Sequence, residues 1–256
     1  MTSLEDRVRE GDPDRYVATL VAPKFARERL WTLYAFNLEI SRAPWVTREP
    51  MIAEMRLQFW TDTLDEIAAG AEPRAHDVAE PLARVWTSAK LPASLGHAMI
   101  AARRWDIYRT PFSDDHTLLN HLDATSGNLM WLSAMALGAG PEAEATVRDM
   151  GLASGLANWF RAVPELQARG CPALPDDSDE AIAALARTGL LRHARSRKSH
   201  AQLPASAHPA LLAGWQTRAV LKRAARDPAA VREGRLLHSE FRRRGGLLLH
   251  ALRQSW

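Results

Sequence analysis

Hydrophobic side chains recur every three or four residues along most of this 256-residue chain, which is the spacing of one face of an α-helix. Leu30, Leu33 and Tyr34 show the pattern clearly. No segment alternates hydrophobic and polar residues as a half-buried strand does. The pattern therefore predicts an all-α fold. The expected helices are Lys24 to Arg42, Met51 to Ala69, Asp77 to Lys90, Pro92 to Arg109, Ser113 to Leu137, Pro141 to Val163, Asp179 to Ser199, Pro209 to Arg226 and Pro228 to Arg253.

Several of these segments begin at residues that favour a helix start. Pro92, Pro141, Pro209 and Pro228 lie at or near a first helical position, where a backbone N–H is not needed. Ser113 precedes two aspartates and offers a cap. The interruptions are short, and none has the composition of a flexible linker or separates two repeats. The sequence therefore predicts one domain over residues 1–256.

Composition and charge limit the classes of function only weakly. Apolar residues make up 46% of the chain and charged residues 25%, as in ordinary globular proteins. The formal net charge is only +3, and aromatic residues are not interleaved with the arginines, so we expect no nucleic-acid partner. The N-terminus has no apolar signal segment, and no window approaches the roughly 18 apolar residues of a membrane span. We expect a cytoplasmic protein.

The spacing of the histidines and the sequence around the serines indicate neither a metal site nor a hydrolase site. His116 and His121 are five residues apart and His193 and His200 seven apart, with no Cys or carboxylate to complete a ligand set. The serines have no nucleophile elbow of the G-x-S-x-G type. The sequence therefore predicts no metal site.

Three segments carry motifs that resemble a known family. The stretch 155–175, GLANWFRAVPELQARGCPALP, places Asn158, Arg161, Val163, Glu165, Gly170, Leu174 and Pro175 at matching positions. The other two segments are Asp14-Arg15-Tyr16 with Leu33 to Phe36, and Arg103 to Asp106. On these motifs the chain resembles the squalene/phytoene synthase family. The resemblance implies an isoprenoid synthase-like helical bundle around a central cavity, with Lys24 to Arg42 and Pro141 to Val163 facing each other across it.

The metal-holding aspartates of that family are absent here. The resemblance places them at positions that this chain fills with Ser41, Arg42 and Trp45 in the first motif, and Ala162 and Leu166 in the second. In the family, these carboxylates hold magnesium ions that grip a prenyl diphosphate. One glutamate on each side is a poor cage for Mg²⁺, which prefers six oxygen ligands. The resemblance therefore implies a protein without a cofactor and without the usual catalysis.

Polar residues remain around these degenerate motifs and are the candidates for ligand binding: Asn37, Glu39, Arg56, Arg104, Asp106, Asn158, Arg161 and Glu165. If a cavity persists, we expect a mouth lined by Asn37, Glu39, Arg56, Asn158, Arg161 and Glu165, whose opposite charges pair with one another. The alternative is a divergent prenyl diphosphate-using transferase of the squalene/phytoene synthase type. There Arg42, Arg104 and Arg161 bind the diphosphate directly, with Mg²⁺ as the cofactor.

A narrower resemblance points to a non-catalytic branch of the family. The segments 35–39 (AFNLE), 49–60 (EPMIAEMRLQFW) and 247–256 are similar to the branch that includes assembly factor 6 of mitochondrial complex I. It implies a respiratory complex I assembly-type or lipid-binding factor, with a respiratory-complex subunit, a membrane surface or a prenyl lipid as partner. Basic runs such as Arg192 to Lys198 offer a face for an anionic membrane. We therefore expect peripheral contact at the inner face of the membrane.

Overall fold

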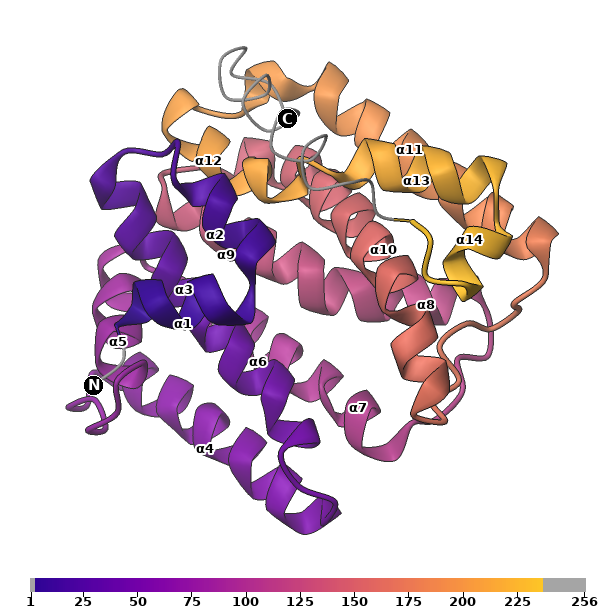
Figure 1. Ribbon diagram of the computed structural model, residues 1–256. Coiled ribbons are helices and arrows are strands. Elements are labelled where there is room, and N and C mark those ends of the chain that lie inside the picture. Colours follow the sequence, from indigo (N-terminus) through magenta and orange to yellow (C-terminus); the bar gives the residue numbers. More distant parts are fainter. Residues whose placement is uncertain (1–2, 237–256) are drawn as a thin grey trace.

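The computed structural model describes residues 3–236, and within this range every regular element is a helix. The predicted all-α class is confirmed. The α-helices are α1 (Leu4–Gly11), α2 (Pro13–Thr19), α3 (Lys24–Arg42), α4 (Pro50–Ala68), α5 (Ala79–Ser88), α6 (Ala93–Ala102), α7 (Arg104–Tyr108), α8 (Asp115–Leu122), α9 (Asn128–Ala136), α10 (Glu144–Ala168), α11 (Asp179–Lys198), α12 (His208–Leu211), α13 (Thr217–Arg226) and α14 (Ala229–Arg232). Figure 1 shows them packed as a bundle, with α3 and α10 on either side of the centre.

Side-chain caps explain where several helices begin. Ser3, Asp114 and Ser178 each accept a hydrogen bond from a backbone N–H in the first turn, at 3.0, 2.8 and 3.3 Å. The cap of α8 is therefore Asp114 and not Ser113. Pro13 and Pro50 occupy the first turns of α2 and α4, where no N–H donor is required.

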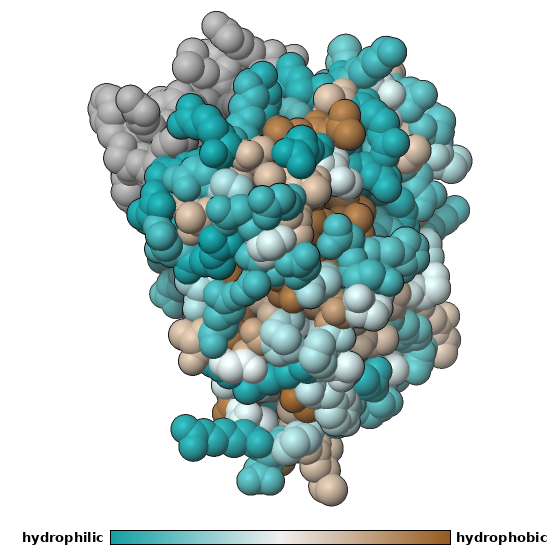
Figure 2. All heavy atoms as spheres, turned by 90° about the vertical axis from the view of Figure 1, so that its right-hand side faces the viewer, coloured by the Kyte–Doolittle hydropathy of each residue, from teal (hydrophilic) through white to brown (hydrophobic). Residues whose placement is uncertain are grey.

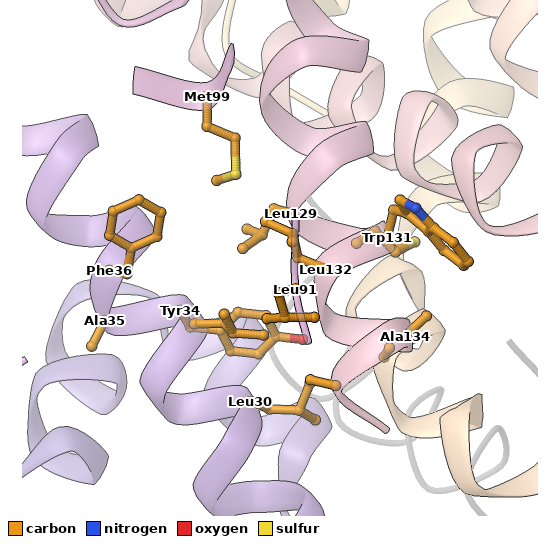
Figure 3. Packing of buried hydrophobic residues seen from close by; sticks show 14 of the residues in the cluster. Leu30, Tyr34, Ala35, Phe36, Leu91, Met99, Leu129, Trp131, Leu132 and Ala134 are labelled. Atoms are coloured by element: carbon orange, nitrogen blue, oxygen red, sulfur yellow. The ribbon is translucent and has the colours of Figure 1, made fainter. Parts of the chain in front are cut away.

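Two hydrophobic clusters form the core. The first packs α1 to α6 against α9 and α12, and Figure 3 shows Phe36, Met99 and Leu129 around a common centre. Phe36 is fully buried and meets Trp60 and Trp86 edge to face, with ring centroids at 5.5 and 6.1 Å. The second cluster joins α8, α10, α11, α13 and α14. A cavity lies between the two groups of helices, because residues of α3 and of α10 both line it.

Some predicted helices are broken in the structure and others are longer. The expected helix Pro92 to Arg109 divides into α6 and α7, and Pro209 to Arg226 divides into α12, a 3-10 turn and α13. The predicted end at Val163 is wrong, because α10 continues through Pro164 to Ala168. Val163 and Leu166 are buried on either side of this proline, and their packing offsets the roughly 3 kcal/mol that an internal proline costs. Helices α1 and α2 were not expected.

The segment expected as one helix from Ser113 to Leu137 contains a π-helical turn at Asp123–Gly127 between α8 and α9. Such turns insert one extra residue into a helix and are frequent at functional sites. The Thr125 hydroxyl donates to the carbonyl of His121 at 2.8 Å and so fills part of the altered backbone pattern. His121, Thr125 and Ser126 all line the cavity as a result.

The remaining observations concern the surface and the chain end. On the face seen in Figure 2, hydrophilic residues cover most of the surface and hydrophobic residues form small separate patches. None of the helices in residues 3–236 combines the length and hydrophobicity needed to cross a bilayer. The expected helix Pro228 to Arg253 is described only as α14, and both its later part and the matching segment 247–256 lie outside the described residues. One domain over 1–256 stays a prediction.

Candidate functional site

A cavity of about 840 Å³ lies between α3 and α10. The α1–α2 turn, α7, α8 with the π-helical turn, and α13 supply further walls. The predicted placement of Lys24 to Arg42 and Pro141 to Val163 around a central cavity is therefore confirmed. Its volume falls within the range of small-molecule sites in proteins.

The α1–α2 turn carries charged residues into this cavity. Asp12 caps α2 by accepting from the Arg15 backbone N–H at 3.0 Å, and its carboxylate also pairs with the Arg15 guanidinium. One residue later than Pro13, Asp14 accepts from Arg161 of α10 at 2.9 Å. The side chains of this pair are only 20% and 22% exposed. The pair therefore joins the N-terminal segment to the opposite wall of the cavity.

A second ion pair is more buried and lies at the start of α7. Arg103 and Asp106 approach to 3.6 Å, and Arg103 also donates to the Asn37 side-chain oxygen at 3.4 Å. Both contacts are long, and Arg103 Nε and Asp106 Oδ2 find no hydrogen-bond partner among the described residues. Burial lowers the pKa of Arg103 and raises the pKa of Asp106. The pair is therefore buried in the cavity wall with part of its hydrogen-bonding capacity unused.

An aromatic wall borders this ion pair. The ring of Trp105 stacks on Phe112 at 4.9 Å, and Trp159 meets both Trp105 and His121 edge to face at 5.2 and 5.4 Å. Burial, together with the positive charge of Arg103, lowers the pKa of His121 to about 3. His121 is therefore neutral at pH 7 and adds an aromatic face, not a charge.

Trp45, in the cavity lining, contacts two arginines. The guanidinium carbons of Arg109 and Arg169 lie 5.3 and 4.8 Å from the ring centre of Trp45, which is within cation–π range. Arg109 donates to the Arg169 carbonyl at 3.2 Å, and Arg169 also pairs with Glu165. This indole, between two arginines, is at the position that the resemblance assigns to a metal-holding aspartate.

The structure brings together most of the residues singled out in the sequence. Those that line the cavity are Asn37, Arg42, Trp45, Asp106, Asn158, Arg161, Ala162, Glu165 and Leu166. Arg161 also donates to Asn158 at 3.2 Å. Ligand binding by this set stays a prediction.

Four of the predicted residues lie outside the lining, which corrects the expected mouth. Glu39 is two residues after Asn37 on α3, so its side chain lies on a different face of the helix. There it accepts a hydrogen bond from Arg7 at 3.1 Å. Ser41 donates to the Leu38 carbonyl, Arg104 donates to Glu54 at 3.0 Å, and Arg56 is exposed on α4. The expected pairing within the mouth set is also wrong, because Arg161 pairs with Asp14.

Sequence reasoning missed Asp12, Arg103, His121 and the role of Asp14. Asp14-Arg15-Tyr16 was recognised as a motif, and Asp12-Pro13 is a helix-start signal that places a carboxylate next to it. Nothing in the sequence indicates that this turn reaches α10, because that contact joins residues 147 positions apart.

The magnesium ions that the fold family implies do not fit the residues present. Within residues 3–236, no three His, Cys, Asp or Glu side chains are grouped so that they could hold a metal ion. Among the lining residues at the two degenerate motifs, Glu165 is the single carboxylate, and it pairs with Arg169. The donor set is therefore arginine-rich where Mg²⁺ needs several oxygens.

The fold is similar to solved synthases. A dehydrosqualene synthase in complex with ligand superposes with a TM-score of 0.80 at 16% identity, over 96% of this chain and 93% of that one. Squalene synthase HpnC from Alicyclobacillus acidocaldarius superposes with a TM-score of 0.73, also at 16% identity, over 90% and 92%. The predicted synthase-like bundle is therefore confirmed as a fold.

Similar curated proteins are described as assembly factors. The chain is 28% identical over 177 residues to the NADH dehydrogenase (ubiquinone) complex I assembly factor 6 homolog of Drosophila melanogaster, covering 66% of this chain and 52% of the relative. Assembly factor 6 of Homo sapiens is 26% identical over 175 residues, covering 66% and 51%. The chain thus spans about half the length of these relatives. The family model for squalene/phytoene synthase matches residues 8–256, and the chain belongs to the squalene/phytoene synthase family.

Proposed function

We propose that this protein is a non-catalytic member of its family that acts as a respiratory complex I assembly-type factor and keeps the cavity as a lipid-binding site. The observation that carries the proposal is the replacement of the metal-holding positions by Arg42, Trp45, Ala162 and Leu166, with Trp45 held between two arginines. Ionising a prenyl diphosphate requires nearby positive charge that stabilises the departing, negatively charged pyrophosphate. This family obtains that positive charge from magnesium ions. Without the carboxylates, that charge is not assembled.

The ion pairs also weigh against direct diphosphate binding. Arg104 lies outside the cavity lining and pairs with Glu54, while Arg161 pairs with Asp14. Two of the three arginines that the transferase alternative would use are therefore already engaged in ion pairs. Arg42 alone has no described partner.

The proposed partner rests on the relatives named as complex I assembly factors. Peripheral contact with the inner face of the membrane is proposed together with it. Met51 and Met55 at the start of α4 are 77% and 66% exposed, and Arg48 lies beside them in sequence. Exposed apolar side chains next to a basic residue suit an anionic bilayer surface. The basic run on α11 supports this less, because Arg192 and Arg195 both bond Asp149.

We expect no condensation product when the purified protein is given Mg²⁺ and a C15 or C20 prenyl diphosphate. The physical reason is the missing carboxylate cage at Ala162 and Leu166 on one side and at Ser41 and Trp45 on the other. Product is measured by mass spectrometry against a heat-inactivated control. Turnover above that control, abolished by a chelator, would support the transferase alternative. Aspartates at 162 and 166 alone are not expected to restore activity.

The assembly role is tested by deleting the gene in the source organism. The expected result is a loss of assembled complex I and of NADH dehydrogenase activity in the membranes, restored by the wild-type gene. The same membranes are probed for the protein, which tests peripheral association. Normal complex I together with loss of a prenyl lipid would contradict the proposal and favour the enzyme.

A further inference from the structure

The charges that line the cavity nearly cancel. Among the described residues the lining contains five arginines, Arg15, Arg42, Arg103, Arg161 and Arg169, and four carboxylates, Asp12, Asp14, Asp106 and Glu165. Four arginines pair with these four carboxylates, one to one. His121 is neutral because of its lowered pKa. The excess is a single positive charge, and it belongs to Arg42.

Arg42 is placed at the edge of the cavity by the α1–α2 turn. A Cβ atom at Gly11 would come within 2.7 Å of Arg42 Nη2, so the guanidinium lies against that turn. No described residue pairs with it. Its donors are therefore available to a ligand that enters the cavity.

Apolar and aromatic side chains complete the lining. They are Trp45, Leu122, Ala157, Trp159, Ala162, Leu166, Ala213, Val220 and Leu236. Ala162 and Leu166 stand where the family places charged ligands, so these positions now contact an apolar part of any occupant.

We infer that the cavity binds an amphiphile with one negative charge and a single apolar chain, and that Arg42 binds its headgroup. The inference rests on the proposed non-catalytic function. A diphosphate carries several negative charges, and without a metal the single excess positive charge of the lining balances only one of them. A neutral lipid would leave Arg42 without a counter-charge, whereas one carboxylate or phosphodiester group matches it.

The test compares ligands that share one chain and differ in charge. The purified full-length protein is titrated at pH 8 with dodecanol, dodecanoate and dodecyl phosphate, each below its aggregation concentration, by calorimetry. Dodecanoate is expected to bind roughly tenfold more tightly than the other two, the difference that one charge-assisted hydrogen bond makes. Tighter binding of dodecyl phosphate, or equal binding of dodecanol, would overturn the inference.

Matched variants locate the charge. Arg42→Gln is expected to lower the affinity for dodecanoate roughly tenfold, to the level of dodecanol. Arg56→Gln is the control, because Arg56 is also exposed and without a described partner but lies outside the lining. Equal losses in both variants, or none in Arg42→Gln, would contradict the assignment.

A third variant tests the charge balance of the cavity, because it is expected to bind a dianionic ligand better. Asp14→Asn removes one lining carboxylate and leaves Arg161 without that ion-pair partner, so the excess rises to two positive charges. Its preference is expected to shift toward the dianionic dodecyl phosphate. Its melting temperature is recorded alongside, so that unfolding is not mistaken for lost binding. An unchanged preference in the folded variant would count against the charge-balance argument.

The source of the ligand is resolved by the headgroup. Lysophosphatidylglycerol carries a monoanionic phosphodiester, and lysophosphatidylcholine is its zwitterionic control. Binding of dodecanoate but not lysophosphatidylglycerol indicates a fatty acid, whereas binding of both indicates that either source is accepted. These titrations use no prenyl diphosphate and no complex I. A negative result would therefore refute the ligand assignment without refuting the proposed function.

Discussion

Gly151→Ala is expected to lower the free energy of unfolding by about 2–3 kcal/mol, although alanine favours helices more than glycine does. Gly151 lies in α10 where this helix crosses the π-helical turn. An added Cβ would lie 2.9 Å from the Gly127 Cα, 3.1 Å from the Ser126 carbonyl oxygen and 3.2 Å from the Met130 Cβ. Two of these atoms are backbone, so α10 or the turn has to move. Both line the cavity, so dodecanoate affinity is expected to fall as well.

Gly189→Ala in α11 is the matched control. Gly189 is also a buried helical glycine, but its added Cβ would meet the Leu221 and Leu156 side-chain methyls at 2.8 and 3.0 Å, and these can rotate. The gain in helix propensity offsets part of that cost, so a change within about 1 kcal/mol is expected. Urea unfolding of both variants measures the difference. Equal losses of unfolding free energy in the two variants would show that the backbone contact at Gly127 does not limit how closely α10 and the π-helical turn approach.

The fold could be predicted from the sequence because the helices bury regular apolar faces. The bounds of α3 agree with the predicted segment Lys24 to Arg42, and α10 begins close to Pro141. The division between α6 and α7 was not predictable in the same way. It arises where Trp105 turns toward Phe112, a contact between aromatic rings that apolar periodicity does not encode. Tertiary packing likewise extends α10 past Pro164.

The site was predictable only where one helix determines the direction of a side chain. Asn158, Arg161 and Glu165 recur every three or four residues on α10, so they share one face, and the structure places all three in the lining. Glu39 and Arg56 were chosen by motif and not by helical phase, and both point elsewhere. Three of the cavity arginines pair with carboxylates three or four residues away, but Asp14, the partner of Arg161, is brought to α10 by long-range packing alone.

The loss of the metal-holding aspartates does not leave unpaired carboxylates in the cavity. A catalytic site of this family holds carboxylates that repel one another until metal binds. Here each lining carboxylate pairs with an arginine, and Trp45 of the first motif packs against Arg109 and against Arg169, which also pairs with Glu165. Such an arrangement stabilises the folded chain without a ligand. The contribution of the Asp14–Arg161 pair to the free energy of unfolding therefore distinguishes a binding protein from an enzyme.

Arg161→Gln and Asp14→Asn are each expected to lower the free energy of unfolding by about 2 kcal/mol, below the 3–5 kcal/mol of a fully buried pair because both side chains are about one-fifth exposed. Each variant removes the 2.9 Å ion pair between these partly buried side chains. The double variant is expected to lose less than the sum, with a coupling energy of about 1–2 kcal/mol. Arg104→Gln and Glu54→Gln are the control pair, which is more exposed at 41% and 27% and is expected to couple by less than about 1 kcal/mol.

A diphosphate-binding enzyme predicts the opposite result. Its arginines would be held apart from carboxylates to receive the substrate, so Arg161→Gln would leave the unfolding free energy unchanged or raise it. Pyrophosphate with Mg²⁺ would then raise the melting temperature of the wild type but not of Arg161→Gln. We expect neither effect, because Arg161 already donates to Asp14 at 2.9 Å and a pyrophosphate would have to break that ion pair with no metal cage in return. A pyrophosphate-dependent rise that disappears in Arg161→Gln would show that this arginine serves a substrate.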